Sequence, residues 1–277
     1  MISTILSNEY SLFIILMVLT AFPVGFFAGF FGIGGGLITV PFLFFIFETL
    51  NLDKSYIMHL AVGTSFAIII PTSIVTVLTH KKNNFVDIKI IKTYGFFVIA
   101  GVLAGTIFVA LMQTKSLLLF FSMVVYFLGT YLLLLQEKTK EIKRKFNLLP
   151  RVIFGFISGF VSAPMGIAGA IINVPVLRYF GYPIKKAIGS AAAIGFIIAL
   201  FGAIGFVVSG SFLKANMPLS LGFINIPAFL IFVPITTFMA RVGANTVNKI
   251  DKSKVQALFG VFLYVVGTVF VYRYLTL

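Results

Sequence analysis

Of the 277 residues, 60% are hydrophobic and only 10% are charged, with a mean hydropathy of +1.12 and a formal net charge of +14. A soluble domain carries about 25% charged residues, so this chain cannot cover a water-facing surface and is predicted to be an integral membrane protein. The chain has no cysteine, which excludes disulfides, thiol catalysis and cysteine metal sites and leaves the redox compartment undetermined.

Apolar runs follow one another along the whole chain. They cover residues 10–31, 33–50, 57–79, 93–111, 116–135, 152–163, 165–180, 187–209, 219–240 and 255–275. A full span needs about 20 apolar residues, so we expect an all-α integral membrane protein with roughly 8–10 segments and no soluble domain. The first run has no basic residue before it, so we take it as a true span and not a secretory signal. The runs 33–50 and 165–180 are short and begin near glycines, which predicts broken or re-entrant helices there.

Most of the basic residues lie in four loops. These loops cover residues 81–92, 138–151, 178–186 and 241–254. Placing all four in the cytoplasm satisfies the positive-inside rule and explains the basic charge without a nucleic-acid partner. The stretches 10–50 and 152–180 must then each enter and leave on one side. Each half becomes a broken-helix hairpin plus three transmembrane helices, in opposite orientations, with both termini outside the cell (plasma or inner) membrane.

The two halves also resemble each other in sequence. Residues 32–43 align with residues 166–177, and seven of the twelve positions are identical. Further matches follow in the same order, at 61–64 with 187–190 and at 121–130 with 259–268. An inverted repeat of this kind is typical of secondary transporters. We therefore divide the chain into a first membrane repeat (1–136), a basic cytoplasmic linker (137–150) and a second membrane repeat (151–277).

The glycine-rich stretches are the candidate substrate site. Glycine breaks a helix, and the half-helix after a break begins with unpaired N–H groups and the positive end of its dipole, which attract anions. Inverted symmetry would bring two such ends together from opposite faces. The residues expected to shape the site are Gly32, Gly34, Gly35, Gly36, Gly166 and Gly169. Those expected to hydrogen-bond the substrate are Thr39, Thr64, Ser65, Asn173 and Ser190.

Helix packing is the alternative explanation for each of these residues. Small residues spaced four apart allow close helix contact, and this explanation fits Gly25 with Gly29 and Gly155 with Gly159 best. The hydroxyl groups in turn can bond to their own helix. Both explanations stay open at this point.

The remaining motifs narrow the chemistry further. All seven acidic residues fall in or near predicted loops, so no carboxylate is placed for a proton relay or a cation site. No nucleophile elbow, zinc-protease motif or phosphate loop is present in the sequence. We therefore expect no enzyme, no cofactor and no metal.

The doubled glycine motif, together with the Ala-x-Gly-Thr/Ser pairs, resembles the TauE/SafE family of membrane proteins over nearly the whole chain. The resemblance implies a transporter, an exporter in several members, of small sulfur oxyanions such as sulfite or of organosulfonates. The second copy carries Ala168 and Ala170 where the first has glycine, which leaves open whether the two halves bind the substrate equally.

The sequence thus predicts a secondary transporter that exports a small anion by alternating access. Its expected partners are the small anionic substrate and the lipid bilayer, and a homo-oligomer stays open. The alternatives are a channel or permease for another small solute, and a non-transporting membrane scaffold subunit.

Overall fold

The computed structural model describes residues 8–31, 35–50, 52–134, 146–215, 217–247 and 252–277. The helices are α1 (Asn8–Phe31), α2 (Gly36–Thr49), α3 (Ile57–Lys82), α4 (Ile88–Ala110), α5 (Thr114–Leu134), α6 (Leu148–Met165), α7 (Ala170–Tyr179), α8 (Ile184–Phe212), α9 (Ile226–Val247) and α10 (Lys252–Thr276). Two short strands, β1 (Ser220–Leu221) and β2 (Ile224–Asn225), form a small hairpin between α8 and α9.

The predicted all-α membrane class is confirmed. Within the described residues, eight helices are long and apolar enough to cross a membrane, and α2 and α7 are shorter apolar helices. These two are the segments that length and glycine content marked as broken helices. The predicted linker is described only from residue 146, and its last three residues form the first turn of α6.

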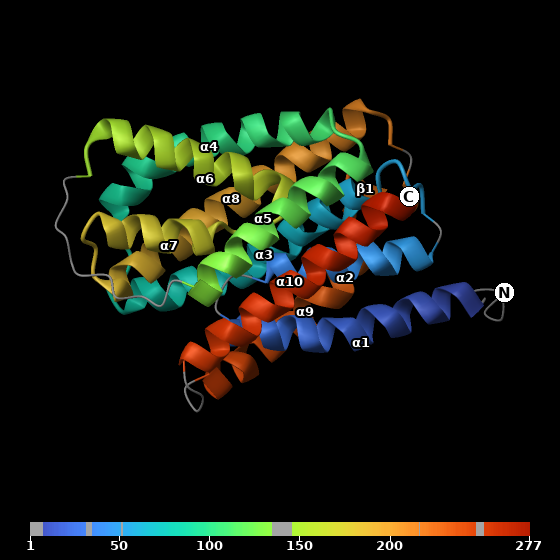
Figure 1. Ribbon diagram of the computed structural model, residues 1–277, viewed down its shortest axis with the longest axis horizontal. Helices are drawn as coiled ribbons and strands as arrows, with labels where there is room; N and C mark the ends of the chain where they lie inside the picture. The colour runs from blue at the N-terminus through green and yellow to red at the C-terminus, as the bar shows by residue number, and fades with distance from the viewer. Residues whose placement is uncertain (1–7, 32–34, 51, 135–145, 216, 248–251) are drawn as a thin grey trace.

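The two short helices complete two hairpins that enter from opposite ends of the molecule. In Figure 1, α1 runs from the end marked N toward the middle, and α2 returns to that end. The pair α6 and α7 does the same from the other end. The start of α1 and the end of α10 lie at one end, whereas the ends of α3, α5 and α7 lie at the other.

The helices pack in pairs that correspond between the two halves. Helix α1 packs along α9, and α6, which occupies the same place in the second half, packs along α4. The central helices α3 and α8 pack on each other. Glycines permit the close approach: a Cβ atom on Gly29 would collide with the carbonyl oxygen of Ala240, and one on Gly159 with the carbonyl oxygen of Val98. Helix packing therefore accounts for these two glycines.

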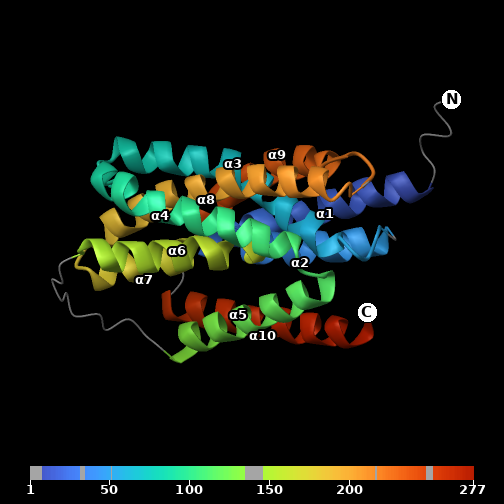
Figure 2. The ribbon, with the colours of Figure 1, turned by 90° about the horizontal axis from the view of Figure 1, so that it is seen from above.

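Helices α5 and α10 lie side by side as an outer layer (Figure 2). Two reciprocal hydrogen bonds join them. The hydroxyl groups of Tyr126 and Thr268 are 2.9 Å apart, and those of Thr130 and Tyr264 are 2.6 Å apart. The four residues belong to the closing segments that align between the two halves of the sequence.

Candidate functional site: the tips of the two hairpins

The two glycine breaks meet inside the molecule. A Cβ atom on Gly36 would collide with the carbonyl oxygen of Gly166 and would lie 2.9 Å from the Cα atom of Ile167. Ser65 Oγ, on the neighbouring helix α3, donates a hydrogen bond of 2.9 Å to the same carbonyl oxygen of Gly166. The structure therefore brings together Gly36, Ser65 and Gly166, which the sequence selected from three separate segments.

Both short helices begin in the same way. Gly35 precedes α2 with φ of 79°, and Gly169 precedes α7 with φ of 65°; both values are in the left-handed region that favours glycine. Neither helix start has a side-chain cap. The first N–H groups of a helix have no intrahelical partner, so each tip carries amide donors and the positive end of a helix dipole. Two such tips in contact favour a negatively charged ligand.

Asn173, in the first turn of α7, has its side-chain oxygen fixed and its amide nitrogen unpaired. Its Oδ1 accepts hydrogen bonds from the Tyr94 hydroxyl at 2.7 Å and from Ser158 Oγ at 2.8 Å. All three side chains are fully buried. The Nδ2 atom has no hydrogen-bond partner, so its N–H groups are free to donate.

Ser162, near the end of α6, is a second unpaired donor at the same place. Its hydroxyl is fully buried and has no partner. Measured from the position of a Cβ atom on Gly169, Ser162 Oγ lies at 2.9 Å and Asn173 Nδ2 at 3.0 Å. An unsatisfied buried donor costs about 1–3 kcal/mol, so two of them beside a bare helix start favour a ligand that accepts hydrogen bonds there. Sequence analysis did not select Ser162.

Among its described residues, the first hairpin has no counterpart of these two free donors. Thr39, which aligns with Asn173, donates its hydroxyl to the carbonyl oxygen of Gly35 at 3.0 Å, within its own helix. Ala28 takes the place of Ser162, with its Cβ atom 2.9 Å from the Cβ position on Gly35. The two tips therefore share their backbone geometry but differ in side-chain chemistry. Gly32 and Gly34 lie outside the described residues.

Two of the side chains predicted to bind the substrate form hydrogen bonds with connecting loops instead. Thr64 Oγ1 accepts a hydrogen bond of 2.9 Å from the backbone N–H of Asn225, in the β-hairpin between α8 and α9. Ser190 Oγ accepts one of 2.9 Å from the backbone N–H of Asp87, between α3 and α4. Both side chains are fully buried. In this conformation these hydroxyl groups fasten a loop at each end of the helix bundle.

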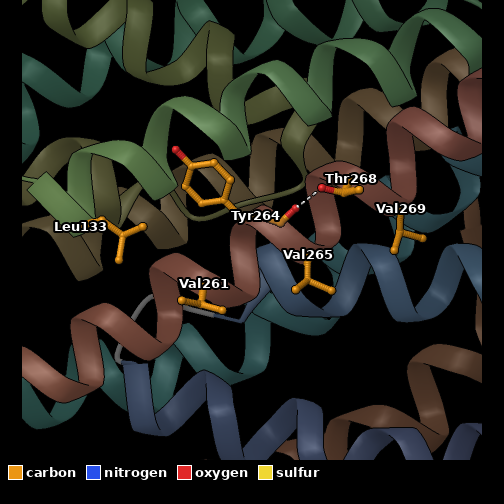
Figure 3. Close-up of a pocket in the computed structure, with 6 residues that line it drawn as sticks. All are labelled: Leu133, Val261, Tyr264, Val265, Thr268 and Val269. Atoms are coloured by element: carbon orange, nitrogen blue, oxygen red, sulfur yellow. Dashed lines mark hydrogen bonds between the residues drawn. The ribbon is translucent and has the colours of Figure 1, made fainter.

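A groove on the described surface lies away from the tips. It has a volume of about 520 Å³ and is lined by Val261, Tyr264, Val265, Thr268 and Val269 of α10 and by Leu133 of α5 (Figure 3). The Thr268 hydroxyl donates to the carbonyl oxygen of Tyr264. With no charged group among its lining residues, this groove suits lipid chains and not an anion. Among the described residues, no cluster of acidic or histidine side chains could hold a metal ion.

Comparison with known proteins is consistent with this architecture. The chain matches the family described as "Sulfite exporter TauE/SafE" over residues 17–270. A "Probable membrane transporter protein" of Haemophilus influenzae is 32% identical over 92% of this chain and 97% of its own length. One of Methanocaldococcus jannaschii is 27% identical over 95% of this chain and 97% of its own length. No solved structure matches the chain. The relatives are named as membrane transporters and not as enzymes, and with its eight candidate spans this chain is a multi-pass membrane transporter that belongs to the TauE/SafE family.

Proposed function

We propose that the protein is a secondary transporter that exports a small anion, sulfite or an organosulfonate, by alternating access at the two hairpin tips. The observation that carries the proposal is the contact of the bare start of α2 with the Gly166 turn that leads into α7, where the bare start of α7 lies beside two buried, unpaired donors, Ser162 Oγ and Asn173 Nδ2. Oxyanions present several acceptor oxygens and match a site made of donors alone. The name of the family supports sulfite as the first substrate to test.

The substrate is held mainly by the second tip in this proposal. The first amides of α7, Asn173 and Ser162 bind its oxygens, and Gly166 and Gly169 keep the backbone close. The tip of α2, with Gly32, Gly34, Gly35, Gly36 and Thr39, adds the second positive helix end. Ser65 holds the two tips in register through the Gly166 carbonyl group, whereas Thr64 and Ser190 act on the loops that they fasten.

Alternating access follows from two oppositely directed hairpins that share one contact. Residues 1–136 and 151–277 form the inverted repeats in this proposal, which is supported by the corresponding pairs α1 with α9 and α6 with α4. Exchange of conformations between equivalent halves would open the tips to each side in turn. The basic loops lie in the cytoplasm and both termini outside the cell membrane, as the positive-inside rule requires.

Sulfite flux in proteoliposomes tests this function. Saturable uptake that is accelerated by sulfite on the other side is expected, because a carrier exchanges its substrate and a channel does not. The Gly36→Ala variant should lose most of this flux, since its methyl group collides with the Gly166 carbonyl oxygen where the tips meet. Gly95→Ala is the matched control, because the nearest atom to its Cβ position is Ile197 Cδ1 at 3.4 Å.

The outcomes separate the alternatives. Flux without saturation or exchange would indicate a channel, and the absence of flux for every anion tried would indicate a non-transporting subunit. Equal exchange by Gly36→Ala and wild type would remove the hairpin tips from the mechanism.

A further inference from the structure

A second cavity, lined by charged and polar residues, lies at the end of the molecule where α7 ends and α4, α6 and α8 begin. It has a volume of about 330 Å³, near the lower limit of the ~300–1,000 Å³ usual for small-ligand pockets. Its lining includes Asp87, Phe146, Arg151, Phe180, Tyr182 and Lys186. We call this cavity the basic-end pocket. These residues come from the loops before α4, α6 and α8 and from the first turns of α6 and α8.

Positive charge in the basic-end pocket is not neutralised by its one carboxylate. Arg151 Nε is buried and has no hydrogen-bond partner. Asp87 instead accepts hydrogen bonds from the backbone N–H groups of Lys89 and Ile90, at 3.0 and 3.2 Å, and caps α4. Among the residues that the structure describes, neither Arg151 nor Lys186 forms an ion pair with Asp87, and the recorded ion pair joins Arg273 to Glu48. Arg151 and Lys186 therefore face the cavity with N–H groups that can bind a ligand.

Helix dipoles add to this charge. The first turns of α6 and α8, which carry Arg151 and Lys186, point their positive ends toward the cavity, and neither helix start has a side-chain cap. Tyr182 contributes a neutral donor: burial and the Asp87 carboxylate raise the pKa of its hydroxyl, although Arg151 lowers it. The hydroxyl thus keeps its proton at neutral pH and can donate.

Aromatic rings give the basic-end pocket an ordered wall. The rings of Phe146 and Phe180 stack with centroids 4.2 Å apart. The Arg151 guanidinium lies 5.3 Å from the centroid of Phe146, and Arg178 Nη1 donates to the carbonyl oxygen of Tyr182 at 3.3 Å. These contacts hold the donors in place before any ligand arrives, which reduces the entropy lost on binding.

We propose that the basic-end pocket is a second anion site, in which Arg151, Lys186 and the Tyr182 hydroxyl bind a small oxyanion group. The pocket would capture substrate before it reaches the hairpin tips, and this role rests on the proposed function. The binding of an oxyanion in the pocket does not depend on that function. The same chemistry fits a free anion such as sulfoacetate and the phosphate of an anionic lipid headgroup.

Binding of radiolabelled sulfoacetate to the purified full-length protein in neutral detergent tests the site. The arms are wild type, Arg151→Gln, Lys186→Gln and the control Lys185→Gln. Lys185 lies next to Lys186 but its Nζ atom is 5.6 Å from the ring of Phe85, and it does not line the cavity. Each variant thus removes one positive charge from the same end. A parallel series counts bound phosphatidylglycerol molecules by native mass spectrometry.

We expect Arg151→Gln and Lys186→Gln each to weaken one component of sulfoacetate binding by about tenfold, the usual effect of losing a charge-assisted hydrogen bond. Lys185→Gln should stay within about twofold of wild type, because an exposed charge acts only weakly through solvent. A loss confined to phosphatidylglycerol would support the site and assign it to a lipid headgroup. Equal effects of all three variants on both ligands, or none, would overturn it.

Flux measurements on the same variants keep this proposal separate from the function. Binding that depends on Arg151 in a protein without sulfite flux would retain the basic-end pocket and reject the transporter mechanism. Normal saturable flux with binding that is insensitive to Arg151 and Lys186 would retain the transporter mechanism and reject the basic-end pocket.

Discussion

Asn173 and Thr39 hold equivalent places in the two halves, yet only Asn173 offers donors to a ligand. The threonine hydroxyl donates its hydrogen bond to the Gly35 carbonyl oxygen at the start of its own helix. The asparagine oxygen accepts hydrogen bonds from Tyr94 and Ser158, which fixes the amide group and leaves its N–H groups without a partner. In the proposed mechanism this residue difference makes the tip of α7 the binding site and the tip of α2 an electrostatic support.

Replacing Ser162 by alanine should separate binding from stability. The Ser162 hydroxyl has no protein partner, so its loss should leave the unfolding temperature unchanged or slightly higher. If the hydroxyl donates to the substrate, losing that bond costs roughly 1.5 kcal/mol and raises the Kd for sulfite about tenfold. Equilibrium binding and thermal aggregation, followed by size-exclusion chromatography, measure the two quantities.

Ser122→Ala is the control for that variant. Ser122 is also a buried serine, but its hydroxyl donates to Leu118 within α5 at 2.8 Å, so its loss should leave sulfite binding unchanged. A Ser162→Ala protein with wild-type affinity would mean that the hydroxyl binds only an ordered water.

At this scale the sequence pointed to the backbone of the proposed site more fully than to its side chains. The glycine turns and Asn173 were selected because the corresponding positions of the other half also carry glycine or a short polar side chain. Ser162 was not selected because a serine in an apolar helix is usually a packing residue. Its signal lay in a comparison of the halves: it precedes Gly169 by the same interval as Ala28 precedes Gly35. The loop bonds of Thr64 and Ser190 depend on tertiary contacts that no local pattern reveals.

The helices α2 and α7 differ in how firmly they are held. Most of α2 is buried, and its Phe44 ring packs on Phe270 of α10 with centroids 5.3 Å apart. In α7 only Asn173 and Leu177 are buried. Glu48 at the end of α2 also forms an ion pair of 3.0 Å with Arg273 of α10. We therefore expect α7 to be the more mobile half-helix during transport.

A charge swap tests whether the Glu48–Arg273 pair holds α2 against α10. Arg273→Glu alone places two acidic groups together and should lower stability by at most about 1 kcal/mol, because the pair is only half-buried. Glu48→Arg alone should have a similar cost, and the double swap should recover much of it. Thermal stability of the four proteins gives the coupling energy.

Independent, additive effects of the two substitutions would show that the pair does not tie these helices. Lys115→Glu provides a control reversal at the same end of the molecule, at a residue of α5 for which no ion pair is described.

The helices were predicted correctly where the length of the apolar run and the glycines at its start were decisive. The short apolar runs became α2 and α7 because glycine in the left-handed region starts each one. Pro41 and Pro175 lie inside α2 and α7, so neither proline ends its half-helix. The hairpin of β1 and β2 was not anticipated, because two-residue strands carry no periodicity.

The whole molecule is organised around a contact between two hairpins that enter from opposite ends. This arrangement places the start of α1 and the end of α10 at one end of the molecule, and the ends of α3 and α7 at the other (Figure 1). Helices α5 and α10 span the outside of this arrangement (Figure 2), joined by hydrogen bonds between aligned residues of the two halves. The sidedness that we propose for this arrangement rests on charge alone.

Cysteine labelling tests that sidedness directly, because the natural chain has no cysteine to remove. Asn83 is exposed at the end of α3 among the basic residues, and Gln113 is exposed between α4 and α5 at the other end. Asn83→Cys should react with a membrane-impermeant maleimide only after cells are permeabilised, since Lys81 and Lys82 hold this loop in the cytoplasm. Gln113→Cys should react in intact cells. The opposite pattern would invert the protein in the membrane and place the basic-end pocket on the outer side. Labelling of both residues in intact cells would contradict the crossing of α4.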